Sequence, residues 1–241
     1  MVKLTNRLQS VADAVPKCGT ATDVGTDHAY IPIYLVQNGI AQRAIATDIA
    51  KGPAEIAGEN IKSHGLSDKI TVQIADGLND IRTVNVPCCS GLPDVVIIAG
   101  MGGKLISDIL YKAADCHRTD TEVFVLQPMT AIYELRRFLY ENNYEIVAED
   151  LAKEDDKIYN ILTVKPLSTV NCQPPTDIEL HIGKNHKHPG MLKEYIEKKV
   201  QSLSTAIENM GNSDGAAVVE KRKELAELRN LLCSWQPKEL H

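Results

Sequence analysis

Two kinds of hydrophobic pattern alternate along the first two thirds of the chain. Short continuous apolar runs predict buried strands, and apolar residues spaced by three and four predict helices that pack on them. The runs predict strands at about 18–24, 43–47, 70–75, 93–99 and 122–126. Helical spacing predicts helices at about 4–15, 30–38, 53–64 and 104–114, the first capped by Thr5, and another through Leu135 to Asn142. Strands that alternate with helices predict a parallel sheet with crossover helices.

Two further apolar segments, at 144–151 and 157–164, are joined by only five residues. A parallel crossover needs about a dozen residues or more, so these strands must pair as an antiparallel hairpin. The sheet of a dinucleotide-binding dehydrogenase continues with parallel strands, whereas a class I methyltransferase sheet ends in an antiparallel strand inserted at its edge. The predicted fold is therefore α/β, a Rossmann-like class I methyltransferase sheet that is mostly parallel with an antiparallel terminal hairpin.

The composition changes at Cys172-Gln173-Pro174-Pro175, where the alternating pattern stops. We place a boundary there, between a methyltransferase domain at 1–170 and a helical domain at 171–241. Two apolar stripes at helical spacing follow, from Leu192 to Met210 and from Val218 to Leu232. They predict two antiparallel helices, a small coiled-coil hairpin, on either side of a break at 211–215. The alternative is that these are core helices of one continuous domain.

The stretch 20–32 predicts a buried strand that runs through a tight turn into a helix, and we place a ligand at this turn. Gly25 lets a ligand approach the backbone, and Pro32 suits the first turn of the helix. A pyrophosphate-binding loop offers bare amides in a pattern of three glycines, of which this turn has one. Because the carboxylates of Asp23 and Asp27 flank Gly25, the turn suits a ligand with hydroxyl groups and positive charge, such as S-adenosylmethionine. The alternative is that Gly25 only ends the strand and Asp27 only caps the helix.

Acidic residues and glycines also follow the other predicted strands. Asp48 follows the second strand, Asp76 the third, and Gly100-Met101-Gly102-Gly103 the fourth. These are carboxyl ends of parallel strands, where open α/β sheets bind ligands. Asp48 lies 23 positions after Gly25, the spacing at which an acidic residue reaches ribose hydroxyls, and Asp76 is placed to accept a hydrogen bond from an adenine amino group. Each aspartate alone could instead cap a helix.

Composition narrows the class of protein. Hydrophobic residues make up 44% and charged residues 24% of the chain, as in an ordinary globular protein, and no apolar run approaches the ~18 residues of a membrane span. The six cysteines show no paired C-x-x-C spacing, so we expect neither a metal nor a redox dithiol. The formal charge of −6 argues against indiscriminate nucleic-acid binding, although a local basic patch can still recruit RNA. We expect a cytoplasmic protein without a membrane partner, and a monomer, with weak dimerisation left open.

Five motifs follow one another in a specific order: Asp23-Val-Gly-Thr-Asp-His-Ala-Tyr-Ile-Pro, Ala46-Thr-Asp-Ile-Ala-Lys-Gly-Pro, Ala75-Asp-Gly-Leu, Ile97-Ile-Ala-Gly-Met-Gly-Gly and Leu126-Gln-Pro-Met. Together they resemble the bacterial tRNA adenine-22 N1-methyltransferases, the TrmK group, through about residue 165. The resemblance implies a class I methyltransferase domain with a C-terminal coiled-coil domain, S-adenosylmethionine as donor (S-adenosylhomocysteine as product) and tRNA as acceptor. Ala29 replaces the last glycine of the usual first methyltransferase motif. The run from Gly100 to Gly103 also replaces the Asn/Asp-Pro-Pro-aromatic motif of amino-directed adenine methyltransferases, which leaves the catalytic residues open.

N1 of adenine carries a lone pair in the ring plane, so the resemblance implies direct displacement without a strong general base, accelerated mainly by positioning. We expect catalytic roles for Asp27, which would stabilise positive charge on the base, and for Tyr30 and Met101. A flipped or exposed adenine would stack on Tyr30 or Tyr159, although either could be a core tyrosine. We expect the cofactor to contact Asp23, Gly25, Asp27, His28, Asp48, Ile49, Asp76, Gly77 and Gly100. We expect the substrate to contact Gly102, Gly103, Tyr159, Arg7, Lys184 and Lys187.

Phosphate contacts to tRNA must come from lysine and arginine. Candidates cluster at the start of the tail, at Lys184, Lys187, Lys193, Lys198 and Lys199, and others are Lys3, Arg7, Arg136 and Arg137. From Thr176 onward the tail carries ten acidic and ten basic residues, so solvated helix faces are the alternative. Three other functions stay open: a methyltransferase acting on a small molecule or protein, a nucleotide-binding oxidoreductase, and a non-catalytic RNA-binding protein with this fold.

Overall fold

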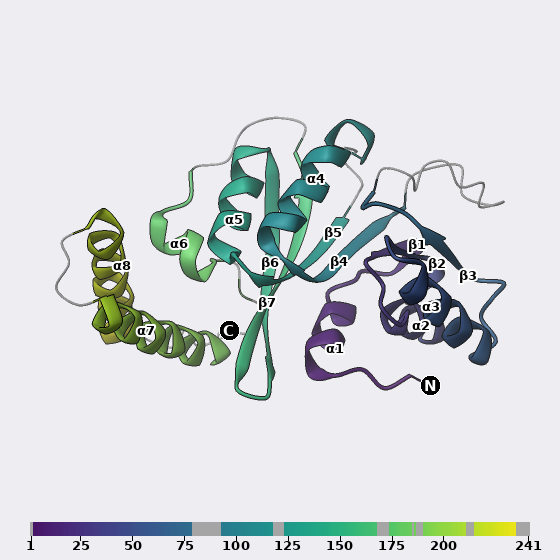
Figure 1. Cartoon of the computed structure of the whole chain (residues 1–241), viewed down its shortest axis with the longest axis horizontal. Helices are drawn as coiled ribbons and strands as arrows, with labels where there is room; N and C mark the ends of the chain where they lie inside the picture. The colour runs from purple at the N-terminus through teal and green to yellow at the C-terminus, as the bar shows by residue number, and fades with distance from the viewer. Residues whose placement is uncertain are drawn as a thin grey trace, which may run out of the picture.

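The computed structural model describes residues 2–78, 93–117, 123–167, 174–184, 186, 190–210 and 215–234. One sheet lies between layers of helices, and further helices follow at the C-terminal end (Figure 1). The strands are β1 (Cys18–Val24), β2 (Ala41–Asp48), β3 (Ile70–Ile74), β4 (Val95–Gly102), β5 (Val123–Thr130), β6 (Tyr144–Glu154) and β7 (Lys157–Pro166). The helices are α1 (Asn6–Asp13), α2 (Tyr30–Gln37), α3 (Lys51–Ser63), α4 (Gly103–His117), α5 (Ile132–Glu141), α6 (Asp177–Ile182), α7 (Gly190–Met210) and α8 (Ala216–Cys233). Within the described residues, no helix combines the length and the apolar character that crossing a membrane requires.

The seven strands follow the order β3-β2-β1-β4-β5-β7-β6. The pairs β1–β2, β1–β4, β2–β3 and β4–β5 are parallel, whereas β7 is antiparallel to both β5 and β6. The predicted antiparallel hairpin is therefore confirmed, and its second strand is inserted between β5 and β6. The β6–β7 hairpin extends past the rest of the sheet in Figure 1, and α1 packs beside the hairpin.

The central strand β4 shows why the sheet needs helices on both faces. Val95 and Ile97 pack with α1 and α2, and Val96 and Ile98 pack with α4 and α5 on the opposite face. Side chains alternate between the faces of a strand, so a strand covered on both faces must be apolar at every position. Each fully buried valine or isoleucine contributes about 1.5–3 kcal/mol to folding. The continuous apolar run therefore explains why β4 lies at the centre of the sheet. Its carboxyl end lies at the edge where we expect the ligand.

Two boundaries differ from the prediction. We expected β4 to end before Gly100, but it continues to Gly102, because β5 also runs on and pairs Met101 with Pro128 and Gly102 with Thr130. The register shifts at this extension, so the glycine run forms an irregular strand end instead of a loop. We expected a five-residue connection in the hairpin, but pairing extends to Glu154 and Lys157 and leaves a two-residue turn.

The C-terminal helices share a hydrophobic cluster of their own that also reaches the hairpin. Tyr195, Ile196 and Leu203 of α7 pack with Leu225 and Leu228 of α8. The cluster also includes Leu151 of β6 and Ile182 of α6. The prediction missed α6, which begins with a capping box: Thr176 accepts a hydrogen bond from Glu179 N–H, and Glu179 accepts one from Thr176 N–H. Residues 168–173, which include the expected domain boundary, and residues 211–214 lie outside the described part of the chain.

One expected surface cation lies in the interior. The Arg136 side chain is 2% exposed and pairs with the Glu149 carboxylate, Nη2 to Oε2, at 2.7 Å. It also donates to the Leu180 carbonyl and to Asn160 Oδ1. Our expectation that Arg136 contacts tRNA phosphate is therefore wrong, because its guanidinium is buried and its hydrogen bonds go to Glu149, Leu180 and Asn160. Its neighbour Arg137 is half exposed and faces outward.

Candidate active site

The turn after β1 is fixed by the neighbouring strand. Gly25 N–H and Thr26 N–H both donate to the Thr47 carbonyl of β2, at 2.8 and 2.7 Å. Gly25 has φ +75°, and a Cβ at this position would collide with the terminal methyl of Met101. Glycine is therefore required twice over, for its backbone angle and for the space that the Met101 side chain fills.

The helix that follows has no side-chain cap. The N-cap of α2 is Ala29, in the left-handed conformation with φ 55°, and it makes no side-chain capping bond. Asp27 instead lies 3.2 Å from His28, Oδ2 to Nε2, and its side chain is 75% exposed. The alternative that Asp27 only caps the helix is therefore wrong, because the chain makes a further turn before α2 begins.

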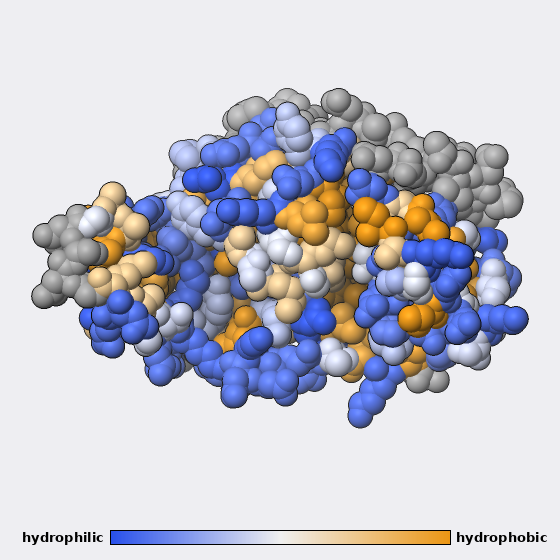
Figure 2. Space-filling view, viewed as in Figure 1, coloured by the Kyte–Doolittle hydropathy of each residue, from blue (hydrophilic) through white to orange (hydrophobic). Residues whose placement is uncertain are grey.

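A first cavity, of about 220 Å³, opens beside the carboxyl ends of β2 and β3. The described residues that line it include Gly25, Asp48, Ile49, Asp76, Gly77, Met101, Leu105, Asp108 and Lys112. One Asp48 oxygen accepts the Ala50 N–H at 2.8 Å, and Asp76 is exposed. Ile49 and Leu105 are 68% and 51% exposed, and Figure 2 shows hydrophobic residues reaching the surface in the middle of this face. The cavity therefore combines carboxylates with apolar walls, as a nucleoside requires.

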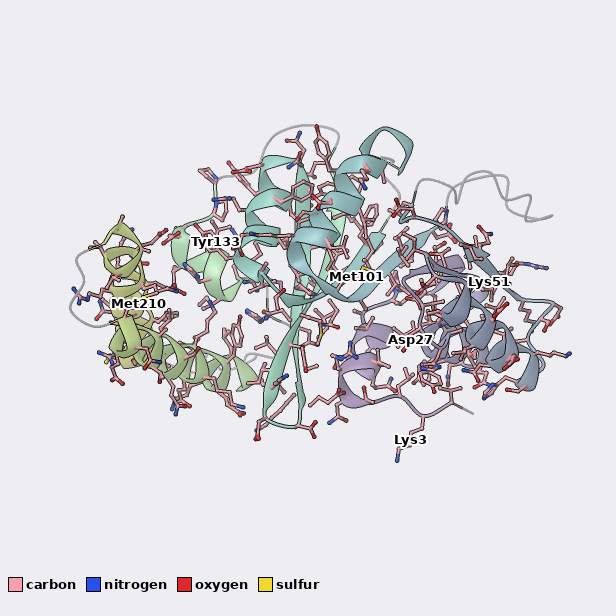
Figure 3. The ribbon with its side chains drawn as sticks, viewed as in Figure 1. Lys3, Asp27, Lys51, Met101, Tyr133 and Met210 are labelled. Carbon is pink, nitrogen blue, oxygen red and sulfur yellow. The ribbon has the colours of Figure 1, made fainter. Side chains whose placement is uncertain are left out.

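A second cavity, of about 390 Å³, lies on the other side of the same turn. The described residues that line it are Arg7, Leu8, Asp23, Gly25, Thr26, Asp27, His28, Ala29, Tyr30, Ile31, Ala99 and Gly100. The His28 and Tyr30 rings stack with their centroids 5.2 Å apart, and Tyr30 is 42% exposed. Gly25 therefore lies at the boundary between the two cavities, because it lines both. Figure 3 places Met101 and Asp27 in this central region, between α4 and the α1–α2 side of the molecule.

Asp23 is the buried charge of the site. The residue is 7% exposed and lies near the end of β1. Burial raises the pKa of Asp23 to about 6, the Thr26 hydroxyl opposes that rise, and the nearby Asp48 carboxylate adds to it. A cation placed against Asp23 would lower this pKa again. The site is therefore built for a ligand that brings positive charge to the end of β1.

The substrate residues that we expected are more scattered. Gly102 packs against Thr130, and a Cβ on Gly103 would meet the Ala131 and Thr130 carbonyls, so both glycines allow β4 and β5 to approach. Neither is among the described residues that line the two cavities. Lys184 lies on the tail, 3.8 Å from Glu179, and Lys187 lies outside the described part of the chain.

The prediction also missed how Arg7 and Gln127 are arranged. The Gln127 side chain is fully buried, and its Oε1 accepts hydrogen bonds from Arg7 Nη1 at 2.7 Å and from Gly100 N–H at 3.1 Å. The Arg7 guanidinium also lies over the Tyr159 ring, 5.6 Å from its centroid. A signal was present in the sequence: Arg7 is three residues after Leu4 and four before Val11, so it shares the apolar face of α1.

The sequence also contained a signal for the cavity residues of α4 that the prediction missed. Leu105, Asp108 and Lys112 are spaced by three and four, so they share one face of α4, and that face forms a wall of the first cavity. The carboxylate acceptors and the apolar walls of the two cavities fit S-adenosylmethionine. Carboxylates line both cavities, those of Asp48 and Asp76 the first and those of Asp23 and Asp27 the second, and they can accept hydrogen bonds from hydroxyl and ammonium groups.

Comparisons with known proteins agree with this geometry. A family model described as a methyltransferase domain matches residues 4–162. The tRNA (adenine(22)-N(1))-methyltransferase of Bacillus subtilis is 38% identical over 164 residues, which cover 68% of this chain and 66% of that relative, just under two thirds of its length. A solved NADB-Rossmann superfamily protein from Streptococcus agalactiae is 34% identical with a TM-score of 0.81, over 95% of this chain and 97% of that one.

A second solved structure carries a ligand. M. capricolum TrmK, in complex with S-adenosylhomocysteine, is 26% identical with a TM-score of 0.80, over 95% of this chain and 98% of that one. The family model and the relatives thus agree on one fold over most of the chain. The chain therefore belongs to the methyltransferase-domain family, and over about two thirds of its length it is similar to a bacterial tRNA (adenine-22-N1)-methyltransferase.

Proposed function

We propose that the protein transfers the methyl group of S-adenosylmethionine to N1 of an adenine in tRNA, at position 22. The observation that carries this proposal is the pair of cavities that share Gly25: one suits an adenosyl group, and the other is open to a nucleobase. The B. subtilis relative acts at this tRNA position by its name, and the M. capricolum neighbour holds the product of this donor. Because the proposed substrate is tRNA, we propose that the protein works in the cytoplasm.

Different residues of the two cavities would bind different parts of the donor. We propose that Asp48 and Ile49 contact the ribose and that Asp76 and Gly77 contact the adenine, because these four residues line the first cavity. Asp23, at the buried end of β1, would receive the ammonium group of the methionine part. Gly25, Gly100 and Met101 would contact the donor where the two cavities adjoin, because Gly25 lines both, Gly100 the second and Met101 the first. S-adenosylmethionine supplies an electrophilic methyl group, and transfer forms the N1–C bond as the S–C bond breaks.

The second cavity would hold the target adenine beside the methionine part of the donor. N1 lies on the Watson–Crick edge, so the base must leave its pair, and an aromatic surface then holds it. The stacked His28 and Tyr30 rings at the cavity provide such a surface. Methylation leaves positive charge on the base, and the exposed Asp27 carboxylate beside His28 would stabilise that charge. No residue has to remove a proton from N1, so the site works by placement.

The tail would supply the wider tRNA surface. Lys184 and Lys193 are each 55% exposed, and each pairs only loosely with a glutamate, at 3.8 Å. We propose that these lysines, with Lys187, contact phosphates, and that the tail from about residue 171 serves as a second, RNA-binding domain. Replacing Lys184 and Lys187 by glutamate should weaken tRNA binding and leave cofactor affinity unchanged.

One experiment tests the reaction and the position together. Undermodified tRNA is incubated with the protein and S-adenosylmethionine, digested, and mapped by mass spectrometry. The expected product is one 1-methyladenosine at position 22. A methyl group on another base, on free metabolites or on protein would support a rival methyltransferase function, and cofactor binding without any methylated product would support the non-catalytic alternative. Saturable binding of NAD without binding of S-adenosylmethionine would support the oxidoreductase alternative.

A further inference from the structure

The Arg7 side chain points from α1 toward the sheet, where it contacts Gln127 of β5 and Tyr159 of β7. Arg7 is one of the residues that line the second cavity, and its side chain is only 20% exposed. Nη1 donates to Gln127, and the guanidinium rests over the Tyr159 ring. Nη1 also lies 3.8 Å from the position that a Cβ on Gly100 would occupy. Residues of β5 and β7, far from α1 in sequence, thus hold the Arg7 guanidinium beside the end of β4.

The contacts of Arg7 leave part of its hydrogen-bonding capacity unused. Glu154 accepts the Arg7 backbone N–H at 3.0 Å, but its carboxylate is 3.8 Å from Nε, too far for a hydrogen bond. Among the described residues, no partner is recorded for Nη2. A guanidinium presents five donors in a fixed fork that matches a carboxylate or a phosphate. Arg7 is therefore prepared for an anionic group.

The same cavity contains the opposite charge. Asp23 is buried at the end of β1, and no ion pair with a lysine or arginine is recorded for it among the described residues. A small ligand with an ammonium group and a carboxylate would satisfy both Asp23 and Arg7. The methionine part of S-adenosylmethionine has these two groups on one carbon atom.

We propose that Arg7 binds the carboxylate of the cofactor's methionine part while Asp23 receives its ammonium group. This inference rests on the proposed donor, and it replaces our sequence-based expectation that Arg7 contacts tRNA. A tRNA phosphate is the other anion that a guanidinium could bind. Phosphate-binding cations usually lie on the open surface, whereas Gln127, Tyr159 and Glu154 surround Arg7 on its protein side. Gln127 is then a positioning residue, because it joins the Arg7 guanidinium to Gly100 N–H.

Ligands that lack the carboxylate give a direct test. Calorimetry measures S-adenosylmethionine and decarboxylated S-adenosylmethionine with the wild type and with Arg7→Met, which keeps an apolar stem without the charge. The wild type should prefer S-adenosylmethionine by about 10- to 100-fold, as for the loss of a charged hydrogen-bonded pair. Arg7→Met should lose that preference: it should bind S-adenosylmethionine about 10- to 100-fold more weakly and the decarboxylated ligand with wild-type affinity. Arg7→Lys, which keeps the charge, should lose less and is the second variant if Arg7→Met does not fold.

The matched control is Lys17→Met. Lys17 is an exposed cation just before β1, at the opposite end of that strand, roughly 20 Å from the cavity. It should bind both ligands as the wild type does.

Three results would overturn the inference. Arg7→Met could weaken both ligands equally, or the wild type could bind both equally while still methylating tRNA. Arg7→Met could also weaken tRNA binding alone, which would assign the cation to a phosphate. Failure of the wild type to bind either ligand would overturn the proposed function itself, and the inference with it.

Discussion

The Arg136 guanidinium on α5 and the Glu149 carboxylate on β6 form an ion pair, Nη2 to Oε2, at 2.7 Å, with both side chains almost fully buried. The pair is also a junction. Arg136 donates to the Leu180 carbonyl of α6, and Glu149 accepts the N–H of Lys184 just after that helix. Asn160, which accepts from Arg136, donates in turn to the Tyr195 hydroxyl of α7. The start of the tail is therefore attached to the sheet through one buried polar network.

Removing one partner of this pair should cost much of the stability. Arg136→Met leaves the Glu149 carboxylate buried without a cation, and such a loss costs about 3–5 kcal/mol. Urea unfolding should therefore show a large fall in the free energy of unfolding. Replacing both residues, as Arg136→Met with Glu149→Leu, should recover part of that loss, because no buried charge then remains unpaired.

The neighbouring arginine gives the control for this prediction. Arg137 lies beside Arg136 on α5, but it is 54% exposed and pairs with Glu141 only at 3.8 Å. Arg137→Met should change the free energy of unfolding by less than about 1 kcal/mol. Equal effects of Arg136→Met and Arg137→Met would contradict the buried network.

The parts of the fold that could be predicted are those that depend on local spacing. A connection of a few residues between β6 and β7 excludes a parallel crossover, and that alone distinguishes this sheet from a dehydrogenase sheet. The acidic residues after β1, β2 and β3 could be placed together because parallel strands end at one edge. Asp48 and Asp76 do line one cavity, together with Gly25.

The parts that could not be predicted depend on contacts between distant segments. Arg136 looks like a surface cation until Glu149 and Leu180 are known to lie beside it. The length of β4 depends on β5, whose pairing continues past Gly100. The spacing of Arg7 showed its face of the helix, but only the position of Gln127, 120 residues later, shows where its guanidinium is held.

Gly25 and Met101 should be coupled in cofactor binding. Gly25→Ala places a methyl group where the Met101 methyl lies and forces alanine to φ +75°, a strain of about 1–3 kcal/mol. We expect cofactor affinity to fall at least tenfold. Met101→Ala removes the collision but not the strain, so the double variant should bind better than Gly25→Ala and worse than Met101→Ala, as calorimetry would show.

A glycine away from the site gives the comparison. Gly39 also has a positive φ, at +64°, but nothing lies within 4 Å of a Cβ placed there. Gly39→Ala should lower stability by a similar strain and leave cofactor affinity unchanged. The predicted coupling is contradicted if Met101→Ala restores no cofactor affinity in the Gly25→Ala background, because the collision would then not matter for binding.

Tyr30 should act through its ring. Stacking of a base on an aromatic side chain contributes about 1–3 kcal/mol, so Tyr30→Ala should lower kcat/KM for tRNA by about 5- to 150-fold. Tyr30→Phe keeps the ring and should retain most of the activity, while cofactor affinity should change little in either variant. Tyr111, which is 69% exposed on α4, is the control, since Tyr111→Ala removes an exposed ring outside the described lining of both cavities. An inactive Tyr30→Phe would show that the hydroxyl, and not the stack, is what matters.

Asp23 should make the free protein less stable as the pH rises. Its folded-state pKa is about 6 against an ordinary value of 3.8, so the folded state binds more protons than the unfolded state between about pH 4 and pH 6. Stability from this group is complete below pH 4 and is lost as the pH rises through 6. The loss is about 3 kcal/mol, from about two pKa units at 1.4 kcal/mol each.

Asp23→Asn tests this directly, because asparagine cannot ionise. Without cofactor, the variant should be more stable than the wild type at pH 7.5 by up to about 3 kcal/mol, and the difference should vanish near pH 4. The wild type should also bind S-adenosylmethionine more weakly below pH 6, by up to about tenfold per pH unit, since a protonated Asp23 cannot pair with an ammonium group. The variant should bind weakly at every pH. Chemical unfolding and calorimetry at pH 5 and pH 7.5 check both effects, and a wild-type affinity that stays constant between these values would exclude Asp23 as the ammonium partner.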